Sequence, residues 1–170
     1  MSTKWILDTS HSEVHFKVKH MVISTVSGDF LDFSGAAESD DDNFSNAKFE
    51  FEAKIDSIHT KSKERDEHLK NEDFFNAAEF PVLTFKGNDF SGDKLHGEIT
   101  IKGVTKPITL SADFGGVIND PFGHQRAGFE FEGELNRKDF GLNWSATTEA
   151  GGLVVADKVK LLVNLEFIKQ

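Results

Sequence analysis

The chain has 170 residues, with 29 acidic and 19 basic side chains and a formal net charge of −10 at pH 7. One hydrophobic core can serve this length, so we expect a single domain over residues 1–170. The acidic balance disfavours nucleic acid or an anionic membrane surface as the primary partner, because both reward clustered lysine and arginine. The chain contains no cysteine, which excludes disulfides and thiolate chemistry.

The N-terminal segment enters a strand at Trp5, Ile6 and Leu7 without the apolar core of a secretion signal. No uninterrupted apolar run approaches the ~20 residues that span a bilayer. We therefore expect a soluble, cytoplasmic protein with no stable membrane insertion.

The aromatic side chains are 17 Phe and 2 Trp, with no Tyr. Phe has no polar group, so it suits surroundings that are apolar on all sides. The composition predicts either an aromatic core or the wall of an apolar cavity.

Alternating apolar and polar residues, the pattern of strands with one buried face, run through most of the chain. The first clear strand, residues 13–20, carries Phe16 and Val18 on its apolar face. Beyond it, Gly28 indicates a bulge or tight bend, and residues 35–46, rich in Asp, Ser and Asn, indicate a loop.

The second clear strand, residues 47–56, alternates Phe49 and Phe51 with charged side chains. The strands that follow are separated by predicted turns at Gly87-Asn88-Asp89 and at Gly115-Gly116. Their apolar faces include Phe85, Ile99, Leu110, Phe129 and Phe131 and, towards the C-terminus, Val159, Leu161, Val163, Leu165 and Phe167.

Ser57–Pro81 is the one sizeable stretch that does not alternate. Residues 61–70 are good helix formers without Gly, Pro or β-branched side chains, and three Phe residues follow before Pro81. This pattern predicts a short helix and an apolar anchor that close one end of the sheet. The residues expected to seal that end are Leu69, Phe74, Phe75 and Phe80, with Arg65, Asp66 and His68 holding the seal in place.

Roughly eight strands joined by short turns predict an all-β antiparallel meander with one short helical insertion. A closed barrel is favoured, because a flat sheet would expose its edges and its apolar face. A barrel of about eight strands is either filled by side chains or holds one slender ligand. Small residues on the inferred inner face fit both alternatives, at Ala53, Gly97, Ala112 and Gly133.

Motifs for catalysis or metal binding are not found. The seven histidines have no spacing dedicated to a metal, and Glu64 and His68 show only the four-residue separation common on helix surfaces. No serine lies in a nucleophile elbow, and no Gly-rich phosphate loop precedes a helix. We expect no metal, no cofactor and no catalytic residue.

Taken in order and spacing, several short motifs resemble the YceI family of polyisoprenoid-binding or lipid-binding proteins over nearly the whole chain. They are Trp5-x-x-Asp8-x-x-His11-Ser12, Val14-x-Phe16-x-Val18-Lys19-His20, Gly28-Asp29-Phe30, Arg65-Asp66-x-His68-Leu69, Asp73-Phe74-Phe75, Phe80-Pro81, Ile101-Lys102-Gly103-Val104-Thr105-Lys106 and Asn136-Arg137-x-Asp139-Phe140-Gly141-Leu142.

This resemblance implies a single lipocalin-like antiparallel barrel whose apolar lumen holds a long isoprenoid or a similar amphiphile. It implies no cofactor and supplies no catalytic set. Some members of the family are dimeric, which makes a homodimer a candidate assembly.

The leading hypothesis is a carrier or sequestering protein for a polyisoprenoid, an isoprenoid quinone or a fatty acid derivative. Two alternatives stay open: an enzyme that modifies such a lipid, with His68 and Asp66 as its acid/base pair, and a ligand-free stress or interaction module with a filled barrel. The residues predicted to line the lumen are Phe16, Val18, Phe49, Phe51, Phe85, Ile99, Leu110, Phe129 and Phe131.

Overall fold

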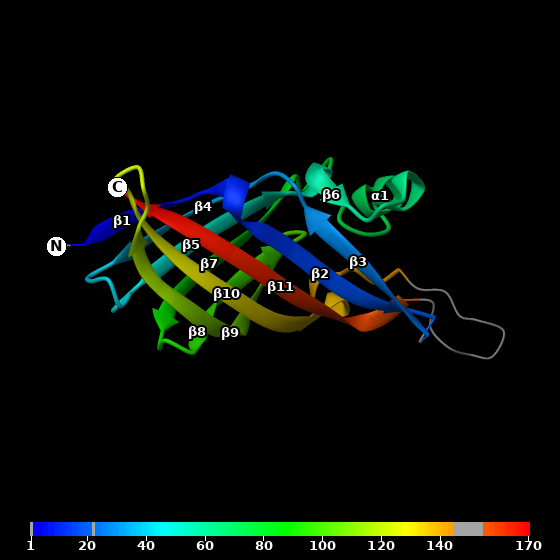
Figure 1. Ribbon diagram of the computed structural model, residues 1–170. Helices are drawn as coiled ribbons and strands as arrows, with labels where there is room; N and C mark the ends of the chain where they lie inside the picture. The colour runs from blue at the N-terminus through cyan, green and yellow to red at the C-terminus, as the bar shows by residue number, and fades with distance from the viewer. Residues whose placement is uncertain (1, 22, 145–154) are drawn as a thin grey trace.

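The computed structural model describes residues 2–21, 23–144 and 155–170. It contains one sheet of eleven strands in which all neighbours pair antiparallel (Figure 1). Eight of these strands form a ring that the pairing of β1 with β11 closes. In ring order they are β1 (Thr3–Leu7), β4 (Phe33–Ser39), β5 (Lys48–Lys54), β7 (Val82–Phe90), β8 (Lys94–Ile101), β9 (Val104–Asn119), β10 (Gln125–Asn136) and β11 (Val155–Lys169). The predicted all-β barrel of eight strands is confirmed.

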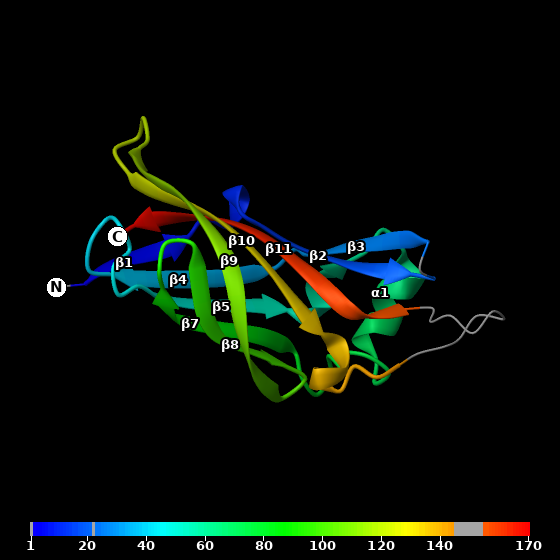
Figure 2. The ribbon, with the colours of Figure 1, turned by 90° about the horizontal axis from the view of Figure 1, so that it is seen from below.

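The order of the strands is not a simple meander, because β11 is too long for one partner. It has 15 residues, and only its last few pair with β1, which has 5. The rest of its edge is covered by β2 (Glu13–His20), which pairs with β3 (Ser24–Phe30), which in turn pairs with β6 (Ile58–His59). These three strands extend the barrel on one side, beyond the ring (Figure 2).

Several glycines predicted to end strands lie inside them. β7 runs through the predicted turn at Gly87-Asn88-Asp89 with a register shift, and β9 runs through Gly115-Gly116 to Asn119. The predicted loop at residues 35–46 also begins too early, since β4 continues to Ser39, which faces Thr3 of β1. In the β7–β8 and β9–β10 ladders a local bulge takes up the irregularity, and the sequence pattern does not distinguish such a bulge from a turn.

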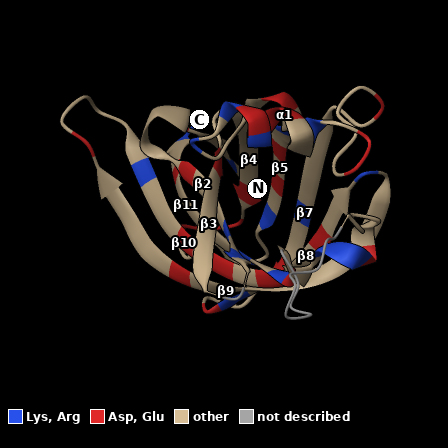
Figure 3. Cartoon of the chain, turned by 90° about the vertical axis from the view of Figure 1, so that its right-hand side faces the viewer, with Lys and Arg blue, Asp and Glu red and all other residues tan. Residues whose placement is uncertain are grey.

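The insertion between β5 and β7 contains α1 (Lys63–Lys70), the short helix predicted within residues 61–70. The side chain of Ser62 caps it by accepting a hydrogen bond from the backbone N–H of Arg65 at 3.3 Å. The insertion also contains a short strand, which the sequence pattern did not indicate: β6 pairs with β3 and anchors the insertion to the sheet. Figure 3 shows α1 lying across one side of the curved sheet.

Three short 3-10 turns complete the secondary structure of the described residues. They are η1 (Thr9–His11), η2 (Ile55–Ser57) and η3 (Arg137–Phe140). Among the described residues, no helix has the length and apolar character needed to cross a membrane.

Aromatic side chains fill the barrel at the end where both termini lie. Phe44, from the β4–β5 connection, inserts among them and contacts the rings of Trp5 and Phe129 at centroid distances of 5.0 and 4.8 Å. The indole N–H of Trp5 donates to the Ser39 hydroxyl at 3.2 Å, so its one polar group is satisfied. This end of the barrel is therefore closed by side chains.

Candidate ligand-binding cavity

A cavity of about 170 Å³ lies inside the sheet, beyond the aromatic end. Its wall is almost wholly apolar and comes from the inward faces of the strands and from the insertion. An engineered apolar cavity of about 150 Å³ stays dry and takes up benzene, so a space of this size and character favours an apolar guest.

The strand alternation placed most of the predicted lining residues on the inner face. Eight of the nine lie in the cavity wall, namely Phe16, Val18, Phe49, Phe51, Phe85, Ile99, Leu110 and Phe131.

Phe129 is the exception. It is 3% exposed and its ring stacks on those of Phe114 and Phe131, at 4.8 and 5.5 Å. It faces inward as predicted, but it lies deeper in the aromatic cluster and is not part of the cavity wall. Alternation identifies the face of a strand, and it carries no information on depth along the barrel.

The predicted sealing residues of the insertion divide in the same way. Leu69, Phe74 and Phe75 lie in the cavity wall. Phe80 packs instead over Gly103, where a Cβ would come within 2.9 Å of its ring. Three of the four therefore face the cavity, and the fourth fastens the insertion to the β8–β9 turn.

Arg65 and Asp66 hold the insertion through one residue, Thr60. The backbone N–H and the hydroxyl of Thr60 donate to the carboxylate of Asp66 at 2.8 and 2.5 Å. Arg65 donates from Nε to the same hydroxyl at 2.8 Å, and from Nη2 to the Thr60 carbonyl. Because both side chains act on the backbone just before α1, they fix where the helix begins.

His68 has different partners from Asp66. Its Nε2 lies 2.8 Å from a carboxylate oxygen of Asp73, and its ring meets Phe74 and Trp144 edge-on at 5.0 and 5.2 Å. The structure thus pairs His68 with Asp73 and Asp66 with Thr60, and it does not assemble the His68–Asp66 pair considered for catalysis.

Burial along two strands shows where the cavity opens. On β11, Leu165 and Phe167 are buried, whereas the inward-facing residues nearer its start, such as Val159, are only half-buried. On β2, Val14 is buried and Val18 is half-buried. Both gradients run towards the β2–β3 turn, so the described residues close the cavity at the aromatic end and cover it less at the opposite end.

Arg137 is the one ionic side chain in the wall whose burial is nearly complete, with 3% exposure. Burial lowers the pKa of its guanidinium, and the nearby carboxylate of Asp157 opposes that shift. The guanidinium donates to four main-chain carbonyls, of Leu142 (2.6 Å), Trp144 (2.6 Å), Ala156 (2.9 Å) and Val155 (3.2 Å). Its donors are thereby directed at the backbone, and the cavity stays apolar.

The inner-face glycines make room for neighbouring side chains. A Cβ on Gly97 would lie 2.7 Å from the ring of Phe85, and one on Gly133 would lie 2.4 Å from Leu110 Cδ2. Gly28, predicted as a bulge, lies in an unbroken β2–β3 ladder beneath the ring of Phe16. The volume missing at these positions is occupied by side chains that themselves line the cavity.

The predicted lining set omitted much of the wall. Alternation continued from Phe16, and along β11, would have added Val14, Val159, Leu161, Val163, Leu165 and Phe167. Arg137 belongs to the motif Asn136-Arg137-x-Asp139-Phe140-Gly141-Leu142, but alternation does not place it in the wall, because its position depends on the turn that follows β10.

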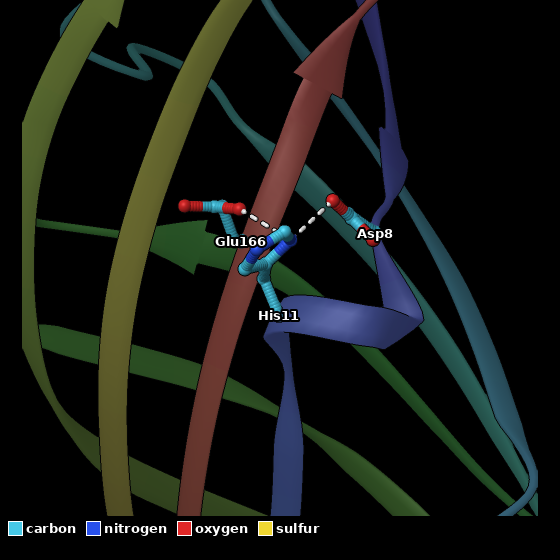
Figure 4. Close-up of side chains that lie close together, drawn as sticks. All are labelled: Asp8, His11 and Glu166. Carbon is cyan, nitrogen blue, oxygen red and sulfur yellow. Dashed lines mark hydrogen bonds and ion pairs between the residues drawn. The ribbon is translucent and has the colours of Figure 1, made fainter. Parts of the chain in front are cut away.

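A polar cluster lies outside the barrel at the closed end (Figure 4). His11 Nδ1 is 2.8 Å from Asp8 and 3.5 Å from Glu166, a spacing within reach of a metal ion. However, Arg126 Nη1 donates to the same two carboxylates at 2.7 and 3.0 Å, and its Nε donates to Asp120 at 2.8 Å. A guanidinium already supplies the positive charge, so the cluster joins the β1–β2, β9–β10 and β11 segments as a structural clasp.

Comparison with known proteins supports the fold and the family. A family model described as the YceI-like domain matches residues 5–167. A UPF0312 protein of Staphylococcus aureus (strain N315) is 37% identical over 166 residues, which cover 97% of each protein. The crystal structure of a YceI protein from Campylobacter jejuni is 34% identical, with a TM-score of 0.74 over 87% of both chains.

Two more distant structures share the fold. BcnA of Burkholderia cenocepacia aligns with a TM-score of 0.77 at 21% identity, over 94% of this chain and 98% of that one. A polyisoprenoid binding domain from Saccharophagus degradans aligns with a TM-score of 0.69 at 16% identity, over 96% and 97%. Because the family model spans almost the whole chain and relatives above 30% identity cover most of it, this protein belongs to the YceI-like family.

Proposed function

We propose that this protein binds a long, mainly apolar chain molecule in the cavity and carries or sequesters it. A polyisoprenoid, an isoprenoid quinone and a fatty acid derivative are the chemical classes that fit. The observation that carries the proposal is the wall itself, which is almost wholly apolar. The polyisoprenoid binding domain that shares the fold supports the choice of ligand class.

Energetics favour such a guest. Each buried methylene contributes roughly 0.8 kcal/mol, so a chain of a few isoprene units binds without polar contacts. Four of the five N–H donors of Arg137 are taken by backbone carbonyls, so its guanidinium is directed at the backbone and not at a headgroup. The apolar end of the ligand therefore enters first, and any polar end stays at the opening near Val18.

The size of the cavity limits how much of the ligand is enclosed. About 170 Å³ accommodates the end of a chain, and the remainder lies along the half-buried residues near the opening.

The test is to identify what copurifies with the protein. Native mass spectrometry and organic extraction of the purified wild type are expected to reveal a bound apolar molecule. Val163→Phe, which adds bulk to the wall, is expected to remove it, whereas Asn164→Phe, at the adjacent outward-facing position, is expected to retain it. An empty wild-type cavity under native conditions would instead support the ligand-free module, and turnover of the extracted molecule would support the enzyme.

A further inference from the structure

The turn between β2 and β3 exposes two large apolar side chains. Ile23 is 84% exposed and Met21 is 41% exposed. Single exposed apolar residues are common on protein surfaces and need no partner. Met21 and Ile23 differ from such isolated residues in two ways: they lie near one end of the cavity, and lysines lie on the neighbouring strands.

The turn lies beside the open end of the cavity. Val18 is paired with Val159, and His20 with Val155, so the last pairs of the β2–β11 ladder include three residues of the cavity wall. Met21 follows His20 directly, and a strand rises about 3.3 Å per residue, which places Met21 roughly 10 Å from Val18. The β2–β3 turn and the start of β11 lie at the same end of the molecule, opposite the termini (Figure 1).

Lysines gather on the outer surface of these strands. Lys17 of β2 faces Lys160 of β11 directly in the ladder, an arrangement of like charges that destabilises a sheet. Among the described residues, neither of them nor Lys19 forms an ion pair. Glu134 faces Lys160 from β10, but its ion pair is with Lys158, at 3.5 Å. An anionic partner would relieve the repulsion between Lys17 and Lys160, for which the described residues supply no ion pair.

The opposite end of the barrel offers a comparison. The β9–β10 hairpin exposes Phe122 of its turn to 83% and Ile118, near the end of β9, to 65%, so it is at least as apolar. Its charged neighbours are instead the carboxylates of Asp120, Asp8 and Glu166 around Arg126. That end is also closed by the aromatic cluster, so among the described residues only the β2–β3 end combines exposed apolar side chains, lysines without an ion pair and the less covered side of the cavity.

We propose that the β2–β3 turn docks on an anionic lipid bilayer. Ile23 and Met21 enter the boundary between headgroups and acyl chains, Lys17 and Lys19 face lipid phosphates, and the opening of the cavity lies against the membrane. Combined apolar insertion and electrostatic attraction is the usual basis of interfacial binding. The net charge of −10 opposes docking only weakly, because charges farther away than about 8 Å are screened at physiological ionic strength.

The test is cosedimentation of the purified full chain with vesicles of phosphatidylcholine and phosphatidylglycerol, and with vesicles of phosphatidylcholine alone. The wild type is expected to bind the anionic vesicles and to be released by salt. Ile23→Ser is expected to weaken binding about tenfold, as for loss of one buried aliphatic side chain. Lys17→Gln and Lys19→Gln are each expected to weaken it about fivefold.

Phe122→Ser is the matched control, because it removes an equally exposed apolar side chain at the other end and is expected to leave vesicle binding unchanged. Circular dichroism and thermal unfolding check that each surface variant is folded. Failure of the wild type to bind anionic vesicles, or an equal loss in Phe122→Ser and Ile23→Ser, would overturn the proposal. The proposal would also be overturned if the wild type were a dimer and Ile23→Ser dissociated it without changing vesicle binding. A second copy of the chain, and not a membrane, would then cover the turn. Vesicle binding does not require a filled cavity, so its failure is distinct from an absence of copurified lipid.

Discussion

The ring of Phe16 lies across Gly28 of the neighbouring strand, so closely that a Cβ on Gly28 would come within 2.2 Å of the ring's Cζ. Phe16 also lines the cavity. The absence of a side chain at Gly28 therefore leaves room for the ring, which forms part of the cavity wall.

Gly28→Ala is expected to push the Phe16 ring into the cavity. Overpacking of this kind costs about 1–3 kcal/mol in the free energy of unfolding, measurable by urea denaturation, and the amount of copurified apolar ligand should fall with it. In Gly28→Ala/Phe16→Leu the smaller side chain removes the clash, so the two substitutions should couple. Strictly additive losses in the double variant would show that the ring is not displaced in this way.

Arg137→Met is expected to destabilise the protein by about 3 kcal/mol or more, because buried carbonyls lose their donors. Arg137→Lys should recover only part of the loss, since an ammonium cannot reproduce the planar fork that serves four carbonyls. The urea concentration at the unfolding midpoint measures the stability of both Arg137 variants. Lys138→Met, at the neighbouring and more exposed position, is the control and should change stability little. Equal midpoints for all three variants would contradict a clamping role for Arg137.

The clasp around Arg126 predicts sensitivity to acid. The hydrogen bond from Arg126 lowers the pKa of Asp120 to about 2. Hydrogen bonds from Ser10 and Arg126 hold the pKa of Asp8 well below its usual range. Unfolded aspartates titrate near pH 3.9, so this stabilisation is complete above about pH 4 and is lost as the pH falls towards 2. Thermal unfolding should show Arg126→Gln below the wild type at neutral pH, with a gap that narrows below about pH 4. A gap that stays constant through the acid range would mean that these carboxylates contribute nothing.

The stabilisation contributed by His15 is expected to be lost as the pH rises, whereas that of the aspartates around Arg126 is lost as the pH falls. Its Nε2 lies 2.9 Å from Glu13 and its Nδ1 contacts Asp29, and these partners, Glu13 first, raise the pKa of the imidazole above its ordinary 6.5. A raised pKa stabilises the fold below about pH 6.5, and the stabilisation is lost as the pH rises through the folded-state value. The difference in melting temperature between wild type and His15→Gln should therefore shrink towards alkaline pH. His96→Gln, where the partner is the Thr109 hydroxyl at 2.8 Å, is the control, and identical pH profiles for the two variants would contradict the prediction.

Much of the barrel follows from local pattern. Alternation in residues 13–20 and 47–56 predicted both strands and the inward faces of Phe16 and Phe49, because side-chain direction along a strand is a property of the backbone. The helix within residues 61–70 was equally visible from composition. The glycines at positions 28 and 87 were wrongly interpreted as strand breaks. Gly28 makes room for the ring of Phe16 on the neighbouring strand, and Gly87 lies at a bulge within β7.

Alternation along the chain was enough to predict which residues face inward, and its interruption marked the insertion between the strands. It could not show that β1 and β11 close the ring, that Phe129 lies below the cavity while Phe131 lines it, or that Arg126 reaches Asp8 across 118 positions. Alternation is local to each strand. Depth, closure and long-range ion pairs depend on the register between strands, which is set only when distant segments pack together.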